Sequence, residues 1–131
     1  MDLEKTREYY RNSTREDICT CEYCQNLADE IKSTYPEIAT YLESLGVNIE
    51  IPFNADIPYE NPKGFWEYVT VNYLVCGSKE GFKETKIGDV DIELGGGPAA
   101  TYKGEYFLVQ LRPIHVKILK DKYKFEGVKW L

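Results

Sequence analysis

The sequence predicts an α+β domain in which N-terminal helices pack on an antiparallel β-sheet of about three to five strands. Apolar residues recur every three or four positions in the first third of the chain and alternate with polar residues in the second half. Because no helical pattern separates the predicted strands, an antiparallel arrangement follows. We expect a single domain over residues 1–131, mainly helical in 1–46, connecting in 47–65 and mainly extended in 66–131.

Three helices are predicted first. Residues 2–11 favour a helix by composition, and Asp2 and Glu4 suit its positive N-terminal end. Residues 22–33 place Cys24, Leu27 and Ile31 on one apolar face. Residues 36–45 begin with proline, which the first turn of a helix tolerates, and the following glycine is typical of a helix end.

The remaining elements are predicted to be extended. Residues 47–53 alternate apolar and polar side chains, although Pro52 restricts any strand there to a sheet edge, and residues 54–64 form an irregular connection. Strands follow near 66–76, 89–94 and 105–112, and Pro113 interrupts the alternation before it resumes at Ile114. The glycines at 95–97 predict a turn, and residues 123–131 are a candidate for a further strand.

Composition excludes several classes of protein. Hydrophobic residues make up 43% of the chain and charged residues 29%, a balance typical of a globular domain. The net charge of −6 argues against a general nucleic-acid binder, because phosphate contacts need a basic surface. Residues 1–65 hold 13 Asp or Glu against 6 Lys or Arg. This acidic half favours a protein partner with a basic surface.

No apolar run approaches the roughly 20 residues that span a bilayer, and the charged first residues, MDLEKTREYYR, contain no apolar signal core. We therefore expect no membrane association and a cytoplasmic location. Cysteines are usually reduced in that compartment.

Cysteine spacing is the most distinctive feature of the chain. Cys21 and Cys24 lie three apart at a predicted helix start, so both thiolates could reach one tetrahedral metal ion, with Cys19 as a third ligand. Cys76 or the single histidine, His115, could be the fourth. The competing interpretation, which we favour from sequence, is that the thiols bind no metal and that Cys24 packs in the core. No cofactor is then expected, and zinc is the alternative.

Two further hypotheses concern chemistry and binding. A thiol-redox enzyme using Cys21 and Cys24 is the weaker one, because acidic neighbours disfavour a thiolate. His115 lies in a predicted strand, and the glycine run lacks the lysine of a phosphate loop, so no nucleophile and base are assembled. Four aromatic residues gather around the long connection, where they either cover one end of the sheet or contact a partner: Tyr59, Phe65, Trp66 and Tyr68. The expected function is a non-enzymatic binding or interaction module.

Several motifs together resemble a family of small uncharacterised bacterial proteins, chiefly from Gram-positive organisms. They are Cys19-Thr-Cys21-Glu-Tyr-Cys24-Gln-Asn, Tyr35-Pro36 through Tyr41-Leu42, Leu45-Gly46-Val47 and Val75-Cys76-Gly77. The resemblance spans most of the chain. It implies a small bacterial cytoplasmic protein and no particular activity or catalytic residue.

Overall fold

The N-terminal part of the chain forms helices, as predicted. The computed structural model describes residues 1–96 and 102–125, and within them lie α1 (Leu3–Arg11), η1 (Arg15–Asp17, a 3₁₀ turn), α2 (Glu22–Thr34) and α3 (Pro36–Ser44). The Asp2 side chain caps α1 by accepting a hydrogen bond from the Lys5 amide at 3.0 Å. After α3 the chain turns through Gly46, whose φ is +83° and whose missing side chain leaves room for α1 to pack closely.

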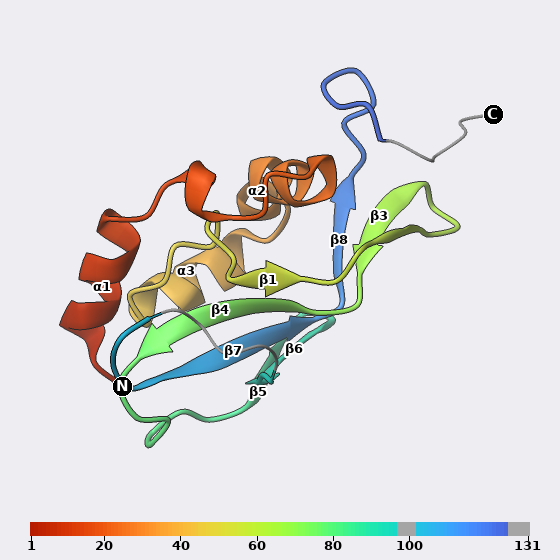
Figure 1. Ribbon diagram of the computed structural model, residues 1–131. Coiled ribbons are helices and arrows are strands. Elements are labelled where there is room, and N and C mark those ends of the chain that lie inside the picture. Colours follow the sequence, from red (N-terminus) through yellow and green to blue (C-terminus); the bar gives the residue numbers. More distant parts are fainter. Residues whose placement is uncertain (97–101, 126–131) are drawn as a thin grey trace.

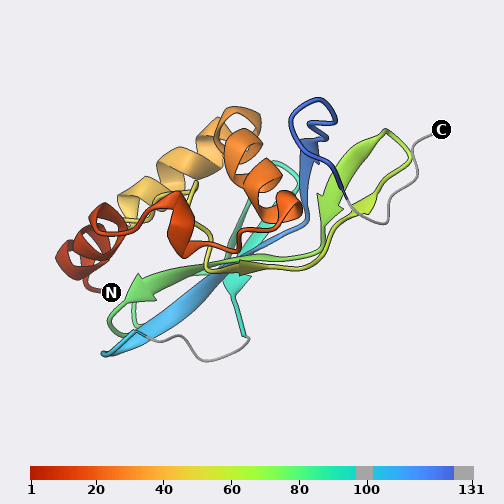
Figure 2. The same ribbon diagram turned by 45° about the horizontal axis from the view of Figure 1, so that its top comes forward.

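Eight strands in the described residues form two antiparallel sheets. The larger sheet has the order β1-β4-β7-β6-β5, and the smaller has the order β2-β3-β8. Their bounds are β1 (Asn54–Ala55), β2 (Tyr59–Glu60), β3 (Phe65–Tyr68), β4 (Val71–Cys76), β5 (Thr85–Ile87), β6 (Val90–Leu94), β7 (Tyr106–Arg112) and β8 (Ile114–Lys117). The helices lie on one side of the larger sheet (Figure 2), which confirms the predicted α+β class.

The two sheets share one long, interrupted strand pair. Tyr68 pairs with Ile114 and Val71 pairs with Leu111, so β3–β8 and β4–β7 keep the same register. The two residues between β3 and β4 therefore lie opposite Pro113 and the residue that precedes it. Proline has no amide hydrogen to donate to a neighbouring strand. The ribbon changes direction at this break (Figure 1).

The break corrects our prediction of one strand over residues 66–76. In β3 the even-numbered Trp66 and Tyr68 are buried, whereas in β4 the odd-numbered Val71, Tyr73 and Val75 face the main core. One continuous strand cannot present both sets to the same side, because side chains alternate with a period of two. The two-residue interruption allows the ribbon to turn over.

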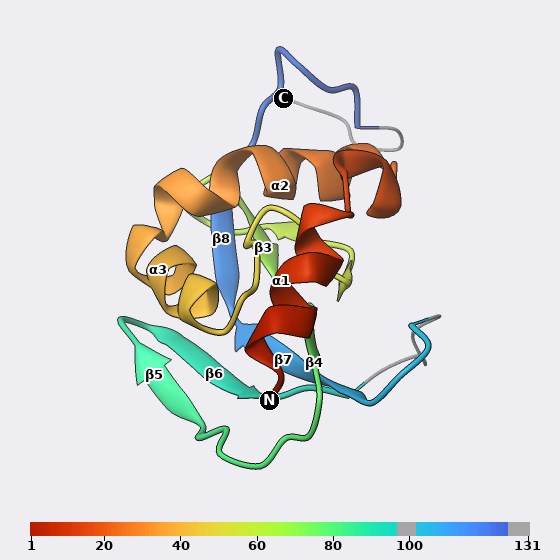
Figure 3. The same ribbon diagram turned by 90° about the vertical axis from the view of Figure 1, so that its left-hand side faces the viewer.

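The main core lies between the helices and both sheets. Buried residues of α2 and α3 pack there against buried strand residues, and each is at most 1% exposed. The helix residues are Leu27, Ile31, Ile38 and Leu42, and the strand residues are Tyr73, Val109 and Leu111. Helix α1 contacts β4 and α2 contacts β8, as Figure 3 shows from the side. None of the helices in residues 1–96 and 102–125 is long and apolar enough to cross a membrane.

Other predicted extended segments differ from the structure. Residues 47–53 form turns rather than a strand, and their alternating apolar side chains Val47, Ile49 and Ile51 are buried from these turns. The connection over residues 54–64 contains the short strands β1 and β2. The strand expected over 123–131 is absent at 123–125, and residues 126–131 lie outside the described part, as does Gly97 of the predicted glycine turn.

Candidate metal centre

The three clustered cysteines meet because a helix begins between them. Cys21 is the N-cap of α2, and its carbonyl accepts the Gln25 amide at 3.1 Å, so the first turn carries Cys24 back over Cys21. Cys19 precedes the cap in a segment without regular secondary structure. One sulfur atom from each of the three residues lies within 4.8 Å of the other two. The predicted grouping of Cys19, Cys21 and Cys24 is thus present.

Two kinds of contact hold the segment that carries Cys19. Buried Ile18 anchors it to the core, and the Gln25 side-chain amide donates to the Cys19 carbonyl at 3.1 Å. The same amide reaches the Arg15 carbonyl at 3.5 Å. Helix α2 therefore holds the segment from which Cys19 extends.

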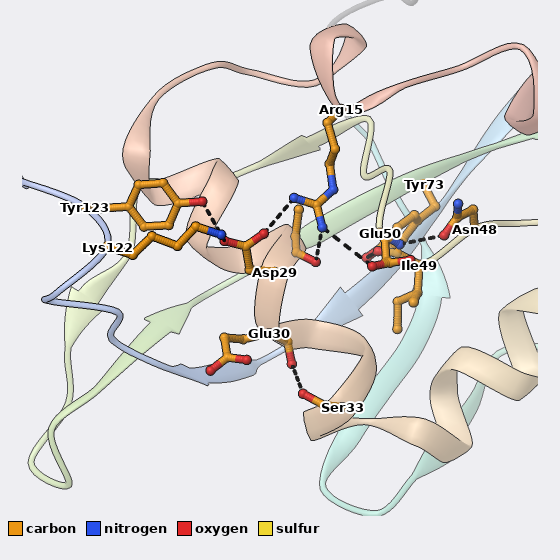
Figure 4. Close-up of polar contacts among 11 residues, drawn as sticks. Arg15, Asp29, Glu30, Ser33, Asn48, Ile49, Glu50, Tyr73, Lys122 and Tyr123 are labelled. Atoms are coloured by element: carbon orange, nitrogen blue, oxygen red, sulfur yellow. Dashed lines mark hydrogen bonds and ion pairs between the residues drawn. The ribbon is translucent and has the colours of Figure 1, made fainter.

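Arg15 and Asp29 hold η1 against α2 just before the cysteine segment (Figure 4). The Arg15 guanidinium donates to Asp29 at 2.8 Å and to the Ala28 carbonyl at 3.0 Å, and it lies 3.5 Å from Glu50. Lys122 donates to the other Asp29 oxygen at 2.8 Å, and the Tyr123 hydroxyl does so at 2.5 Å. Sequence reasoning missed this network, because its directly bonded partners lie up to 94 positions apart.

The cluster's thiols differ in acidity. Hydrogen bonds from the backbone and thiol of Cys21 lower the pKa of Cys19. Burial, followed by hydrogen bonding and charge from Cys21 and Cys19, raises the pKa of Cys24. In the absence of metal, negative charge is therefore favoured at Cys19 and disfavoured at Cys24.

All three cysteines line one cavity of about 180 Å³. Its other wall comes from the segment that leads into and follows β1, including Pro52, Phe53 and Ile57. Asp56 also lines the cavity, and its carboxylate accepts a hydrogen bond from Thr70 at 2.9 Å. The cysteines thus lie on the wall of a small cavity whose lining includes several apolar side chains.

The two residues predicted as a fourth ligand lie elsewhere. Cys76 is fully buried near the end of β4, and its thiol hydrogen-bonds Tyr102 and raises the pKa of that phenol. His115 lies in β8, where its Nε2 is 2.8 Å from Glu67 Oε1. Neither belongs to the group formed by Cys19, Cys21 and Cys24. The structure therefore does not bring either residue to the three clustered sulfur atoms.

Two of the four predicted partner-binding aromatics are buried. Trp66 is 3% exposed and Tyr68 is 0% exposed. Trp66 packs edge-on against Tyr23 and Phe125, with ring centroids 5.3 and 5.1 Å apart. The Tyr68 hydroxyl donates to the Tyr23 carbonyl at 2.5 Å. These side chains face α2 because alternate residues of β3 point to the core, so they are not surface contacts.

The other two aromatics are exposed. Tyr59 is 49% exposed and Phe65 is 42% exposed. Their strands pair so that Tyr59, Glu67 and His115 form one row across the outer face of the smaller sheet. The Tyr59 hydroxyl donates to Glu67, and this bond, followed by the charge of His115, lowers the Glu67 pKa. Sequence reasoning did not find this row, because it depends on the strand register.

Comparison with models of known protein families, with curated proteins and with solved structures found no match. The family resemblance stated from the motifs therefore stays a prediction.

Proposed function

We propose that this protein binds one thiophilic metal ion, with zinc as the leading candidate, through Cys19, Cys21 and Cys24. The proposal depends on one observation, the mutual approach of three sulfur atoms within 4.8 Å. Thiolates on tetrahedral zinc lie about 3.8 Å apart, because each Zn–S bond is about 2.3 Å long. Shifts of about 1 Å or less would complete the arrangement. Zinc is also the common ion of small thiolate sites.

Unmetallated thiols were the interpretation we favoured from sequence, because Cys24 belonged to an apolar helix face. Two features of the site now favour metal binding instead. Cys24 is only partly buried, and its thiol contacts two other thiols. A metal ion would replace the proton on each thiol and remove the penalty of placing these groups together. Reduced thiols are required, which agrees with the proposed cytoplasmic location.

Metal content and metal affinity test the proposal. We expect full-length protein, purified without oxygen and reduced with a phosphine, to contain or take up one equivalent of zinc. Each of the single variants Cys19→Ser, Cys21→Ser and Cys24→Ser should weaken zinc binding at least 100-fold. Competition with a chromophoric chelator measures the affinity. Cys76→Ala is the matched control, because Cys76 lies outside the group. Binding below 0.2 equivalents, or equal loss in Cys76→Ala, would contradict the proposal.

A second candidate function is the interaction module predicted from sequence, now confined to the outer face of the smaller sheet. Tyr59 and Phe65 are 49% and 42% exposed, and both lie on this face because they alternate with the buried residues of the sheet. Exposed aromatic side chains are typical of protein contact sites. Glu60 and Glu67 lie on the same strands and would suit a partner with a basic surface.

The test compares two variants in recovery of a partner from the native cells. Phe65→Ser should abolish recovery, whereas Lys86→Ser, at an exposed position on the remote strand β5, should not. The recovered protein must then bind the purified wild-type chain directly. Equal recovery by both variants would rule out this surface.

A further inference from the structure

The thiol cluster offers a metal ion three donors, one fewer than the four of a closed structural zinc site. Within residues 1–96 and 102–125, the close group of Cys, His, Asp and Glu side chains contains Cys19, Cys21 and Cys24 alone. Cys76 is packed beside Tyr102, and His115 pairs with Glu67. A zinc ion bound by this group would therefore have one further coordination position.

That position has a defined space beside it. Cys19, Cys21 and Cys24 all line the cavity of about 180 Å³. A cavity of this volume is large enough to hold several water molecules. Pockets for drug-sized ligands are larger, about 300–1,000 Å³. The fitting ligand is therefore a molecule of a few non-hydrogen atoms.

The lining indicates the chemistry of that ligand. Ile18, Phe53 and Ile57 make part of the wall apolar, which suits a short aliphatic molecule. Glu22 adjoins Cys21 and Asp56 lines the cavity, so a hard anion such as phosphate would meet negative charge. A thiol is uncharged until its sulfur binds the metal, which then offsets the charge of the thiolate, and thiolate sulfur is a soft donor of the kind that zinc accepts.

Resting on the proposed metal binding, we infer that the fourth position opens onto this cavity and takes up a small aliphatic thiol. In the binding step the metal–oxygen bond to a water molecule breaks and a metal–sulfur bond forms. The thiol proton passes to the solvent, and no electrons are transferred. The protein would then be a receptor for a small thiol rather than a closed structural site.

Cobalt(II) spectroscopy of the full-length protein tests this inference. The protein is reduced with a phosphine, kept free of small thiols and loaded with one equivalent of cobalt(II). We expect thiolate charge-transfer absorption from three cysteines, and a saturable increase of about one third when 2-mercaptoethanol adds a fourth sulfur. Glutathione, which is too large for the cavity, should cause at most one tenth of that increase at the same concentration.

Two variants locate the thiol. Ala55→Leu adds bulk to the cavity wall and should weaken the response to 2-mercaptoethanol at least tenfold while cobalt(II) remains bound. Ala39→Leu adds the same bulk on α3, away from the cavity, and should respond as wild type does. Retained cobalt(II) absorption shows that each variant still folds around its metal. An equal response in both variants would overturn the inference.

The outcomes separate this inference from the metal-binding proposal. If cobalt(II) does not bind, the proposed function fails. If it binds through all three cysteines and 2-mercaptoethanol changes nothing, metal binding stands and the open position is wrong. If a response then appears in Asp56→Asn, the Asp56 carboxylate fills the fourth position, which also overturns the inference.

Discussion

Asn26 joins α2 to β8 through a single buried amide. Its Nδ2 donates to the Lys117 carbonyl at 2.9 Å, and its Oδ1 accepts the Leu119 amide at 2.9 Å. The residue is 0% exposed. Its side chain thus bonds the last residue of β8 and a residue just beyond that strand, much as a neighbouring strand would. In the sequence Asn26 is one polar residue of an amphipathic helix, and nothing nearby indicates two partners more than 90 positions away.

Asn26→Ala should destabilise the protein by about 1–3 kcal/mol, because it removes both hydrogen bonds of a fully buried side-chain amide. Urea denaturation followed by circular dichroism measures the change. Asn12→Ala is the control, since Asn12 is exposed at the end of α1, and it should change stability by less than about 0.5 kcal/mol. Similar losses in the two variants would show that the Asn26 bonds contribute little.

Thr6 has a comparable role at the edge of β4. Its hydroxyl accepts the Cys76 amide at 3.0 Å and donates to the Asp2 carbonyl at 2.7 Å, and it is fully buried. Thr6→Val keeps the shape but removes both bonds, so we expect a loss of about 1–3 kcal/mol and faster hydrogen exchange at the Cys76 amide. Thr6→Ser retains the hydroxyl and should preserve the protection of that amide. Unchanged exchange in Thr6→Val would contradict this assignment.

At the scale of elements, local patterns predict what each segment is but not where it changes partners. The helices begin and end within one residue of the predicted 2–11, 22–33 and 36–45, because caps, prolines and apolar spacing are local signals. The division between β3 and β4 depends instead on Pro113, which lies opposite the break but more than 40 positions away. A regular alternation over 66–76 does not contain that information.

In the candidate site, too, local sequence predicts some features, whereas others depend on how distant strands pair. Cys21 and Cys24 come together through one helical turn, so their spacing predicts the contact with Cys19 nearby. The cavity wall beside them comes from the segment around β1, which is placed by its pairing with β4. The exclusion of Cys76 and His115 likewise depends on which sheet each strand joins. The donors were therefore predictable, and their surroundings were not.

The end of β6 tests how tightly the larger sheet is packed. A methyl group at Gly95 would lie 2.1 Å from Asn72 Oδ1, and the buried Asn72 amide is held by a 2.8 Å hydrogen bond to Asn54. Gly95→Ala should therefore displace Asn72 and cost about 1–3 kcal/mol. At Gly96 a methyl group meets nothing within 4 Å, so Gly96→Ala is the matched control for thermal unfolding. Equal melting temperatures for the two variants would contradict the predicted clash.

At the scale of the whole molecule, Asp29 connects segments from both ends of the described chain. Its carboxylate accepts bonds from Arg15 before α2 and from Lys122 and Tyr123 after β8. Burial would raise the Asp29 pKa, but the hydrogen bonds from Lys122, Tyr123 and Arg15 outweigh it and lower the pKa to about 2. The ionised carboxylate therefore stabilises the fold that positions the cysteine segment.

This shift predicts how stability depends on pH. The unfolded pKa is near 3.8 and the folded pKa is about 2, so the contribution is fully present above about pH 4 and is lost as pH falls towards 2. We expect Asp29→Asn to be less stable than wild type by about 1 kcal/mol at pH 7, allowing for solvent screening, and the difference to shrink below pH 4. Urea denaturation at pH 7, 5, 3 and 2 measures this difference in stability.

Glu30→Gln is the matched control, because the Glu30 carboxylate points away from the network (Figure 4). A pH-independent difference between Asp29→Asn and wild type would show that the lost stability comes from packing rather than from the ionised carboxylate.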